Sequence, residues 1–286
     1  MNEVVVGVDP RELSVPALLW AADEATCRGL RLHLVCAVPP VHDHLAYDAV
    51  NHGAALRVRA GSALADADDL LRDLHPGLSP VTELVDGPPA AVLGERAARA
   101  TLTVVGSRRL GRFAEVLAES SVVLPLTARA DGPVAVVRSP EHAVHHPPTV
   151  VVGVDGSASC RAAVDFAADQ ASLRGAHLRA VWVWPRPLFE DDDLAEGHAG
   201  QRALAEVMAG AAERHPDVKI SEEVLKGRPV QQLAVTAHEA LALVVGRRGH
   251  GGFTGLGLGS TAHGLLHQAD CPVIVVPRTG PPASAT

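Results

Sequence analysis

Residues 246–261 form the stretch of this chain whose residue types and spacing best suit chemistry. The stretch reads GRRGHGGFTGLGLGST, with seven glycines, two arginines, one histidine and a closing Ser-Thr pair. It follows an apolar run at residues 241–245 that predicts a buried strand. Glycines directly after such a strand let backbone N–H groups approach an anion, and Ser260 and Thr261 are suited to open a helix whose first N–H groups point the same way. We therefore predict a phosphate-binding loop.

Asp155 is the second residue placed for chemistry, because it ends an apolar strand pattern at residues 150–154. In open parallel α/β sheets, ligands bind outside the carboxyl ends of the strands, where the strand order reverses. A carboxylate there suits a ribose hydroxyl, and the backbone near Val183, at the end of the next predicted strand, suits an adenine edge. Two plainer interpretations stay open: Asp155 as a helix cap, and residues 246–261 as a flexible surface turn.

The framework around these residues occurs twice. VVVGVD stands at residues 4–9 and 150–155, LTVVG at 102–106 matches ALVVG at 242–246, and PVAVV at 133–137 matches PVIVV at 272–276. The order is the same and the offset is about 140 to 146 residues, which indicates tandem domains rather than a solenoid. The predicted domains are residues 1–138 and 150–278, with a proline-rich linker at 139–149 and a disordered tail at 279–286.

Each copy alternates strand and helix patterns. Strands are predicted at residues 4–8, 31–38, 79–85, 101–105 and 134–137, and again at 150–154, 177–184, 219–225, 240–245 and 273–276. Helices are predicted at residues 14–28, 54–74, 159–174 and 201–215, and others after Pro88, after Pro229 and before each last strand; Ser14 and Ser159 are the expected caps. This alternation predicts an α/β fold with two tandem, doubly wound, mostly parallel five-stranded sheets that carry helices on both faces.

The composition narrows the class of protein. Of the 286 residues 47% are apolar and only 3% aromatic, which predicts a core of Val, Leu and Ala. A net charge of −8 provides no domain-wide basic face and argues against nucleic acid as the main partner. No apolar run approaches the roughly 18 residues of a membrane span, and no signal peptide is visible. The four cysteines have no CxxC spacing, so we expect reduced thiols in a cytoplasmic protein.

These motifs together resemble the universal stress protein family, in its tandem two-domain form and ATP-binding subclass. That subclass carries G-x2-G-x9-G-[ST] after the fourth strand, and this chain has Gly246-x2-Gly249-x9-Gly259-Ser260. The resemblance covers nearly the whole chain, twice, and implies an adenine-nucleotide α-hydrolase-like, Rossmann-like fold. The loop is not of the Walker type, because no GxxxxGK[ST] occurs.

The resemblance implies that the second copy holds ATP, with or without Mg²⁺. Gly153 and Asp155 would lie by the ribose and adenine, and the backbone of Val183 would meet the base. The residues expected around the phosphates are Gly246, Arg247, Arg248, Gly249, His250, Gly251, Gly252, Gly259, Ser260 and Thr261. For the two arginines and the histidine, plain solvent exposure is the alternative. The resemblance also implies that the two copies form an internal pseudo-dimer and that chains form a homodimer.

The first copy departs from the motif. It keeps Gly7, Asp9, Gly106 and Ser120, but Arg109 stands where the second copy has Gly249, and Glu119 where it has Gly259. A carboxylate beside a phosphate in a partly desolvated site costs on the order of a kcal/mol or more. We predict that the first copy binds ATP weakly or not at all; the alternative is that Arg109 reaches the phosphates in a changed geometry.

The sequence therefore predicts a cytoplasmic, ATP-binding stress-response protein, with no catalytic or metal-binding residue assigned and no client identified. Two other functions stay open: a slow ATPase or phosphotransferase that uses the same site, and a scaffold whose assembly is tuned by ATP. Three further polar clusters are interpreted as solvated rather than metal-binding, namely residues 42–44, 145–146 and 190–193.

Overall fold

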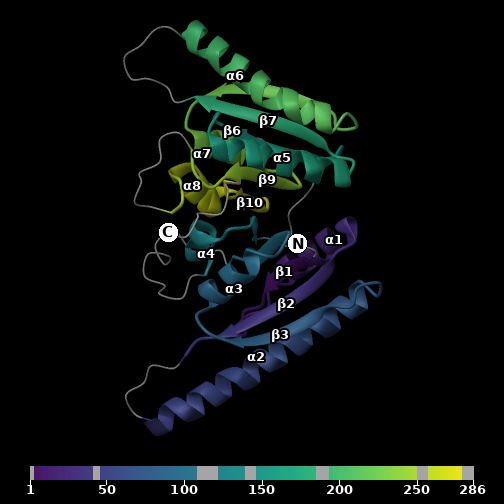
Figure 1. Cartoon of the computed structure of the whole chain (residues 1–286), viewed down its shortest axis with the longest axis vertical. Coiled ribbons are helices and arrows are strands. Elements are labelled where there is room, and N and C mark those ends of the chain that lie inside the picture. Colours follow the sequence, from purple (N-terminus) through teal and green to yellow (C-terminus); the bar gives the residue numbers. More distant parts are fainter. Residues whose placement is uncertain are drawn as a thin grey trace, which may run out of the picture. The chain divides into compact units, whose positions relative to one another are not determined.

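The computed structural model describes residues 3–40, 46–107, 122–138, 146–184, 193–249 and 257–278, and for residues 46–52, 158 and 193–199 it describes the backbone alone. The chain divides into two compact units, Met1–Pro140 and Glu141–Thr286. Each unit is a sheet flanked by helices (Figure 1). No helix in the described ranges is long and apolar enough to cross a membrane.

In the first unit, all strand pairs are parallel and the order is β3-β2-β1-β4-β5. Its elements are β1 (Glu3–Gly7), α1 (Val15–Arg28), β2 (Arg31–Val38), α2 (Ala46–Leu74), β3 (Val81–Asp86), α3 (Pro89–Ala97), β4 (Leu102–Gly106), α4 (Val123–Arg129) and β5 (Val134–Val137).

The second unit repeats this arrangement, with parallel strands in the order β8-β7-β6-β9-β10. Its elements are β6 (Thr149–Val154), α5 (Ala158–Leu173), β7 (His177–Trp184), α6 (Asp193–Arg214), β8 (Ile220–Lys226), α7 (Pro229–Thr236), β9 (Ala242–Gly246), α8 (Ser260–Gln268) and β10 (Val273–Val276).

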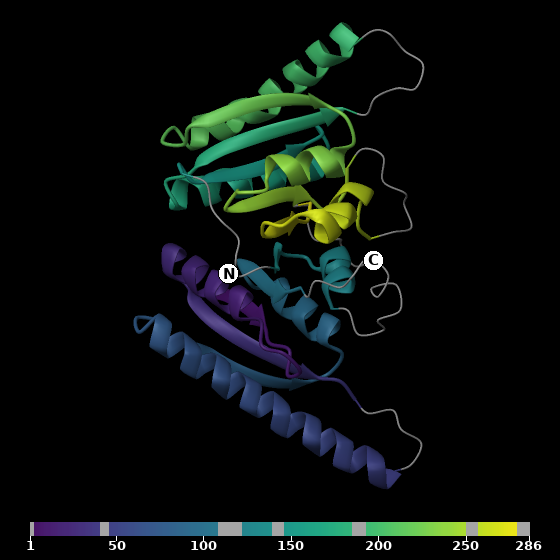
Figure 2. The ribbon, with the colours of Figure 1, turned by 180° about the vertical axis from the view of Figure 1, so that it is seen from behind.

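The strand order places helices on both faces. In the first unit the chain moves outward from β1 through β2 to β3, then returns to the other side of β1 for β4 and β5. Because such crossovers are right-handed, the reversal puts α1 and α2 on one face and α3 and α4 on the other. Consistent with this, α1 packs against α2, and α3 against α4; Figure 2 shows α2 running along β2 and β3. The order reverses between β1 and β4, and in the second unit between β6 and β9.

The predicted fold class is confirmed, and the reason is visible in the core. The central strands β1 and β6 are valine runs that are buried between two helix layers, and the four residues of β5 and of β10 are buried throughout. A strand of this kind is buried on both faces only when helices cover both faces of the sheet. Continuous apolar runs that alternate with helical patterns therefore predict a doubly wound sheet.

Two helices begin earlier than predicted. The helix expected at residues 54–74 begins at Ala46, and the one expected at 201–215 begins at Asp193. In α2 the buried side chains are Ala60, Leu64, Ala67 and Leu71, and residues 53–59 bury none. The apolar periodicity marks only the packed half of the helix. Once that half has formed, each further turn adds hydrogen bonds at little cost in free energy. The helix therefore continues beyond the packed stretch.

The cap predicted for the helix after β6 was also misplaced. Ser159 lies inside α5 and is buried; the N-cap is Ser157, whose side chain accepts a hydrogen bond from the Cys160 N–H. In the first unit Ser14 is the N-cap of α1, as expected, but makes no side-chain capping bond.

Candidate functional site

The carboxyl ends of β6 and β9 bring two predicted site residues together. These neighbouring parallel strands flank the reversal of strand order, so Asp155, just after β6, and Gly249, three residues after β9, share one edge of the sheet. A Cβ placed on Gly249 would overlap Oδ2 of Asp155. The carboxylate of Asp155 therefore lies directly against the backbone of the glycine-rich loop (residues 246–261).

The other oxygen of Asp155 shapes the turn into α5. Its Oδ1 accepts a hydrogen bond from the Ser157 N–H at 2.9 Å. The first unit makes the same turn, where Oδ1 of Asp9 accepts from the Arg11 N–H at 2.8 Å. Asp155 is therefore not the N-cap of α5, which is Ser157; one of its oxygens holds the turn before the helix, and the other faces the loop.

Backbone hydrogen bonds close the base of the loop. The Arg247 N–H donates to the Val276 carbonyl and the Gly259 N–H donates to the Arg247 carbonyl, each at 2.8 Å. The loop is therefore drawn together so that its last residues return to its first. This closure places the start of α8 beside Gly249, since a Cβ on Gly259 would lie 3.6 Å from the Gly249 nitrogen.

The helix after the loop begins without a side-chain cap. Its N-cap residue is Gly259, which has no side chain, and its first helical hydrogen bond runs from His263 to the Gly259 carbonyl. The N–H groups of Ser260, Thr261 and Ala262 precede that bond, so they have no partner within the helix. Such N–H groups and the helix dipole favour an anion at this position.

A residue outside the predicted set joins the two sides of the site. The Ser157 hydroxyl donates to the Arg248 carbonyl at 3.3 Å, across 91 positions of sequence. The signal that singles out Ser157 is the comparison of the two copies, because the first copy has Arg11 at the matching position.

Other predicted site residues have packing roles. A Cβ on Gly153 would lie 3.1 Å from Leu233 and from Val245, and Gly7 of the first unit meets Leu93 in the same way. A Cβ on Gly246 would lie 2.9 Å from that of Ser159 in α5. These glycines therefore let helices pack closely on the strands, and their positions alone give no evidence of a ligand contact.

The remaining predicted residues are distributed as follows. Val183 is half-buried and lies one residue beyond the last β6–β7 pair, Val154 with Trp182, which leaves it at the same sheet edge. Arg248 and Ser260 are exposed, and Arg247 and Thr261 are half-buried. The described ranges do not include His250, Gly251, Gly252, Arg109, Glu119, Ser120 or the polar residues 42–44 and 190–192.

Charge at this edge differs between the units. The last residue of the outer strand is Lys226 in the second unit and Asp86 in the first. Lys226 lies over the Trp184 ring at 5.0 Å from its centroid, whereas Asp86 pairs with Arg57. With Arg248, the second unit thus presents two exposed cations near the carboxyl ends of its strands.

The thiol nearest the site is poorly suited to nucleophilic chemistry. Cys160 lies in the first turn of α5, and burial raises the pKa of its thiol despite backbone hydrogen bonds at Asp155 and Gly156 that lower it. Among the described residues no group of three or more His, Cys, Asp or Glu is arranged to hold a metal ion. The described geometry places the first N–H groups of α8, the Asp155 carboxylate and two exposed cations at one edge of the sheet.

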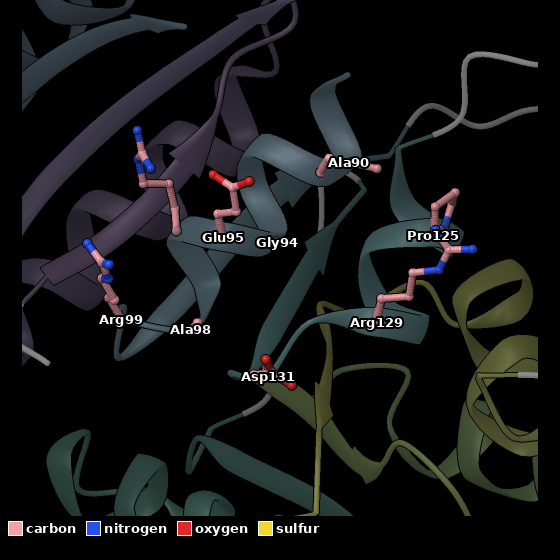
Figure 3. Close-up of a pocket in the computed structure, with 10 residues that line it drawn as sticks. Ala90, Gly94, Glu95, Ala98, Arg99, Pro125, Arg129 and Asp131 are labelled. Atoms are coloured by element: carbon pink, nitrogen blue, oxygen red, sulfur yellow. The ribbon is translucent and has the colours of Figure 1, made fainter. Parts of the chain in front are cut away.

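A separate pocket of about 600 Å³ lies in the first unit between α3 and α4 (Figure 3). Its lining includes Ala90, Gly94, Glu95, Arg99, Arg129 and Asp131. The two labelled arginines stand on opposite sides of it and point away from each other. In the second unit the matching helices α7 and α8 are in contact, with Val230 against Gly264. No predicted site residue lines the pocket, so it contributes nothing to the candidate site.

Comparisons with known proteins agree with the motifs. The model of the universal stress protein family matches residues 1–138 and 148–277. The chain is similar to a universal stress protein of Mycolicibacterium smegmatis, with 34% identity over 290 residues and 96% of each chain covered. It shares its fold with a universal stress protein from Archaeoglobus fulgidus DSM 4304, with a TM-score of 0.73 and 18% identity over 97% of this chain and 96% of the other. A universal stress protein solved in complex with cAMP covers 46% of this chain and 98% of its own at 30% identity, with a TM-score of 0.38. The resemblance is confirmed, and the chain belongs to the universal stress protein family.

Proposed function

We propose that this protein is an ATP-binding regulatory protein whose second unit holds the nucleotide. The observation that carries the proposal is the uncapped start of α8 at Gly259, which is hydrogen-bonded to Arg247 at 2.8 Å, with the Asp155 carboxylate against Gly249. An anion site and a carboxylate at one sheet edge suit the two ends of a nucleotide, namely its phosphates and its ribose.

The phosphate end of the proposal rests on backbone donors. The first-turn N–H groups of α8 have no partner within the helix, and Gly259 offers no oxygen to satisfy them. By contrast, α5 is capped by its own Ser157. Of these two helices, α5 thus has a side-chain cap, whereas α8 would be completed by an anion from outside.

The base end rests on position and charge. Val183 lies just beyond the last residue pair of β6 and β7, at the same edge of the sheet. There its backbone would meet the adenine. Lys226 and Arg248 add positive charge that favours a polyphosphate in the second unit, while the first unit has Asp86 in place of Lys226. We therefore propose about one nucleotide per chain, bound in the second unit.

Isothermal titration of the full chain with ATP tests this proposal. The expected stoichiometry is close to one, and Gly259→Glu, which gives the second copy the residue of the first, should abolish binding. A Cβ at this position lies 3.3 Å from the Arg247 carbonyl oxygen, so Gly259→Ala is the matched control that adds bulk without charge and should weaken binding less.

The reciprocal change sharpens the test. In the double variant Arg109→Gly/Glu119→Gly the first copy regains the full glycine pattern, and the stoichiometry should rise toward two. Two nucleotides bound by the unaltered chain, or none at millimolar ATP, would contradict the proposal.

A further inference from the structure

Two carbonyl groups at the start of the glycine-rich loop are tied to fixed partners. The Arg247 carbonyl accepts from the Gly259 N–H, and the Arg248 carbonyl accepts from the Ser157 hydroxyl. In a trans peptide the carbonyl and the following N–H point in opposite directions. The Arg248 N–H is therefore turned away from Gly259, and the Gly249 N–H away from Ser157.

The Ser157 hydroxyl makes one donated and one accepted hydrogen bond in this arrangement. A hydroxyl has one proton to donate, and here it goes to the Arg248 carbonyl. Its oxygen also accepts from the Cys160 N–H at 3.3 Å. The same side chain thus fixes the start of α5 and the orientation of the Arg248–Gly249 peptide, which lie 91 positions apart.

We propose that Ser157 is a positioning residue that turns the Gly249 N–H toward a bound phosphate, so that the preference for nucleoside polyphosphates over the nucleoside depends on its hydroxyl. This inference rests on the proposed function of the second unit. It adds a second reason for asymmetry between the units, because Arg11 stands at the position of Ser157 in the first copy. There, the Arg11 N–H donates to Asp9, and the side chain carries no acceptor for a capping bond.

The test compares adenosine, AMP, ADP and ATP by isothermal titration of the full chain and of Ser157→Gly. Glycine is a tolerated N-cap that costs only a few tenths of a kcal/mol, so α5 should persist while the hydroxyl is lost. The dissociation constant for ATP should rise about three- to tenfold, the range expected for one hydrogen bond, while that for adenosine should change less than about twofold. Ser157→Thr, which keeps the hydroxyl, should restore the ATP value.

The outcomes separate this inference from the proposed function. If the unaltered chain binds neither ATP nor adenosine, the proposed function fails. If it binds ATP but Ser157→Gly weakens all four ligands equally, or none, the role of Ser157 fails and the proposed function stands.

A second measurement needs no variant. In amide NMR spectra of the unaltered protein, the Gly249 N–H resonance should shift strongly with ATP and little with adenosine. Equal shifts with both ligands would overturn the inference.

Discussion

Gly249→Ala should greatly weaken nucleotide binding while leaving the fold intact. An added Cβ would lie less than 3.0 Å from Oδ2 of Asp155, a separation that real Cβ atoms essentially never show. The carboxylate has little freedom to retreat, because its other oxygen accepts from the Ser157 N–H at 2.9 Å. Either Asp155 leaves that turn or the loop backbone moves outward.

The size of the effect follows from what each movement breaks. Moving Asp155 breaks its hydrogen bond with the Ser157 N–H and so lowers the stability of the fold, whereas moving the loop misplaces the Gly249 N–H relative to the phosphates and so lowers the affinity for ATP. A hydrogen bond to a charged group contributes about 1.5 to 3 kcal/mol, so the dissociation constant for ATP should rise roughly 10- to 150-fold. Gly249 is exposed and in a loop, so we expect the loop to move while Asp155 keeps its bond to Ser157, and the free energy of unfolding should then change by less than about 1 kcal/mol.

Titration calorimetry with ATP and urea unfolding measure the two quantities separately. Gly259→Ala is a milder comparison, since its Cβ would lie 3.3 Å from the Arg247 carbonyl oxygen and 3.4 Å from the Arg248 Cα. Its loss of ATP affinity should be smaller than that of Gly249→Ala. A Gly249→Ala protein that binds ATP as tightly as the unaltered chain would refute the reasoning that Asp155 and Gly249 form one site.

Three further predictions concern stability and thiol chemistry. Gly61 in α2 and Gly175 after α5 both have open space around an added Cβ, but only Gly175 has a positive φ, +57°. In urea unfolding, Gly61→Ala should therefore stabilise the protein by about 0.5 to 1 kcal/mol, and Gly175→Ala should destabilise it by about 1 kcal/mol. The hydrogen bonds from Arg96 lower the pKa of Glu83 below its usual 4.5, so the pair stabilises the fold above that pH and the gain is lost as pH falls through the lowered value. Glu83→Gln should remove this pH dependence. Because the pair is partly exposed, we expect it to contribute under about 1 kcal/mol to the free energy of unfolding. A variant whose stability varies with pH as in the unaltered chain would contradict this prediction. Ellman's reagent should modify one thiol quickly in the native protein, Cys27, and four after denaturation, because burial raises the pKa of Cys36 to about 11 and of Cys271 to about 12; two fast native thiols would show the assignment to be wrong.

The sequence predicted the fold class because the strands are long apolar runs that only a two-sided burial explains, and because the second copy repeats the order of the first. It located the helix starts less well. Ser157 and Ser159 are both acceptable caps by residue type, and what decides between them is the turn made by Asp155, whose Oδ1 already holds the Ser157 N–H. The bond from Ser157 to Arg248 spans 91 positions and depends on how two strands end together, which no local pattern contains.

The glycines illustrate how the repeat separates packing from binding. Gly7 and Gly153 occupy matching positions and both face a leucine of the overlying helix; Gly106 and Gly246 also match, and both face the first turn of a helix at Ser14 or Ser159. A glycine that lets a helix pack on the sheet in both copies is required by the fold that the copies share. Gly249 and Gly259 have no counterpart glycine in the first copy, and in the second they lie against Asp155 and Arg247 at the sheet edge. Because the described part of the first copy has the same strand order with Arg109 and Glu119 in the sequence at these positions, that strand order does not require glycine there. The close approach of Asp155 to Gly249, and of the start of α8 to the loop, is then not demanded by the strand order that the two units share. It is at these two positions that substitutions should reduce nucleotide binding with little loss of stability.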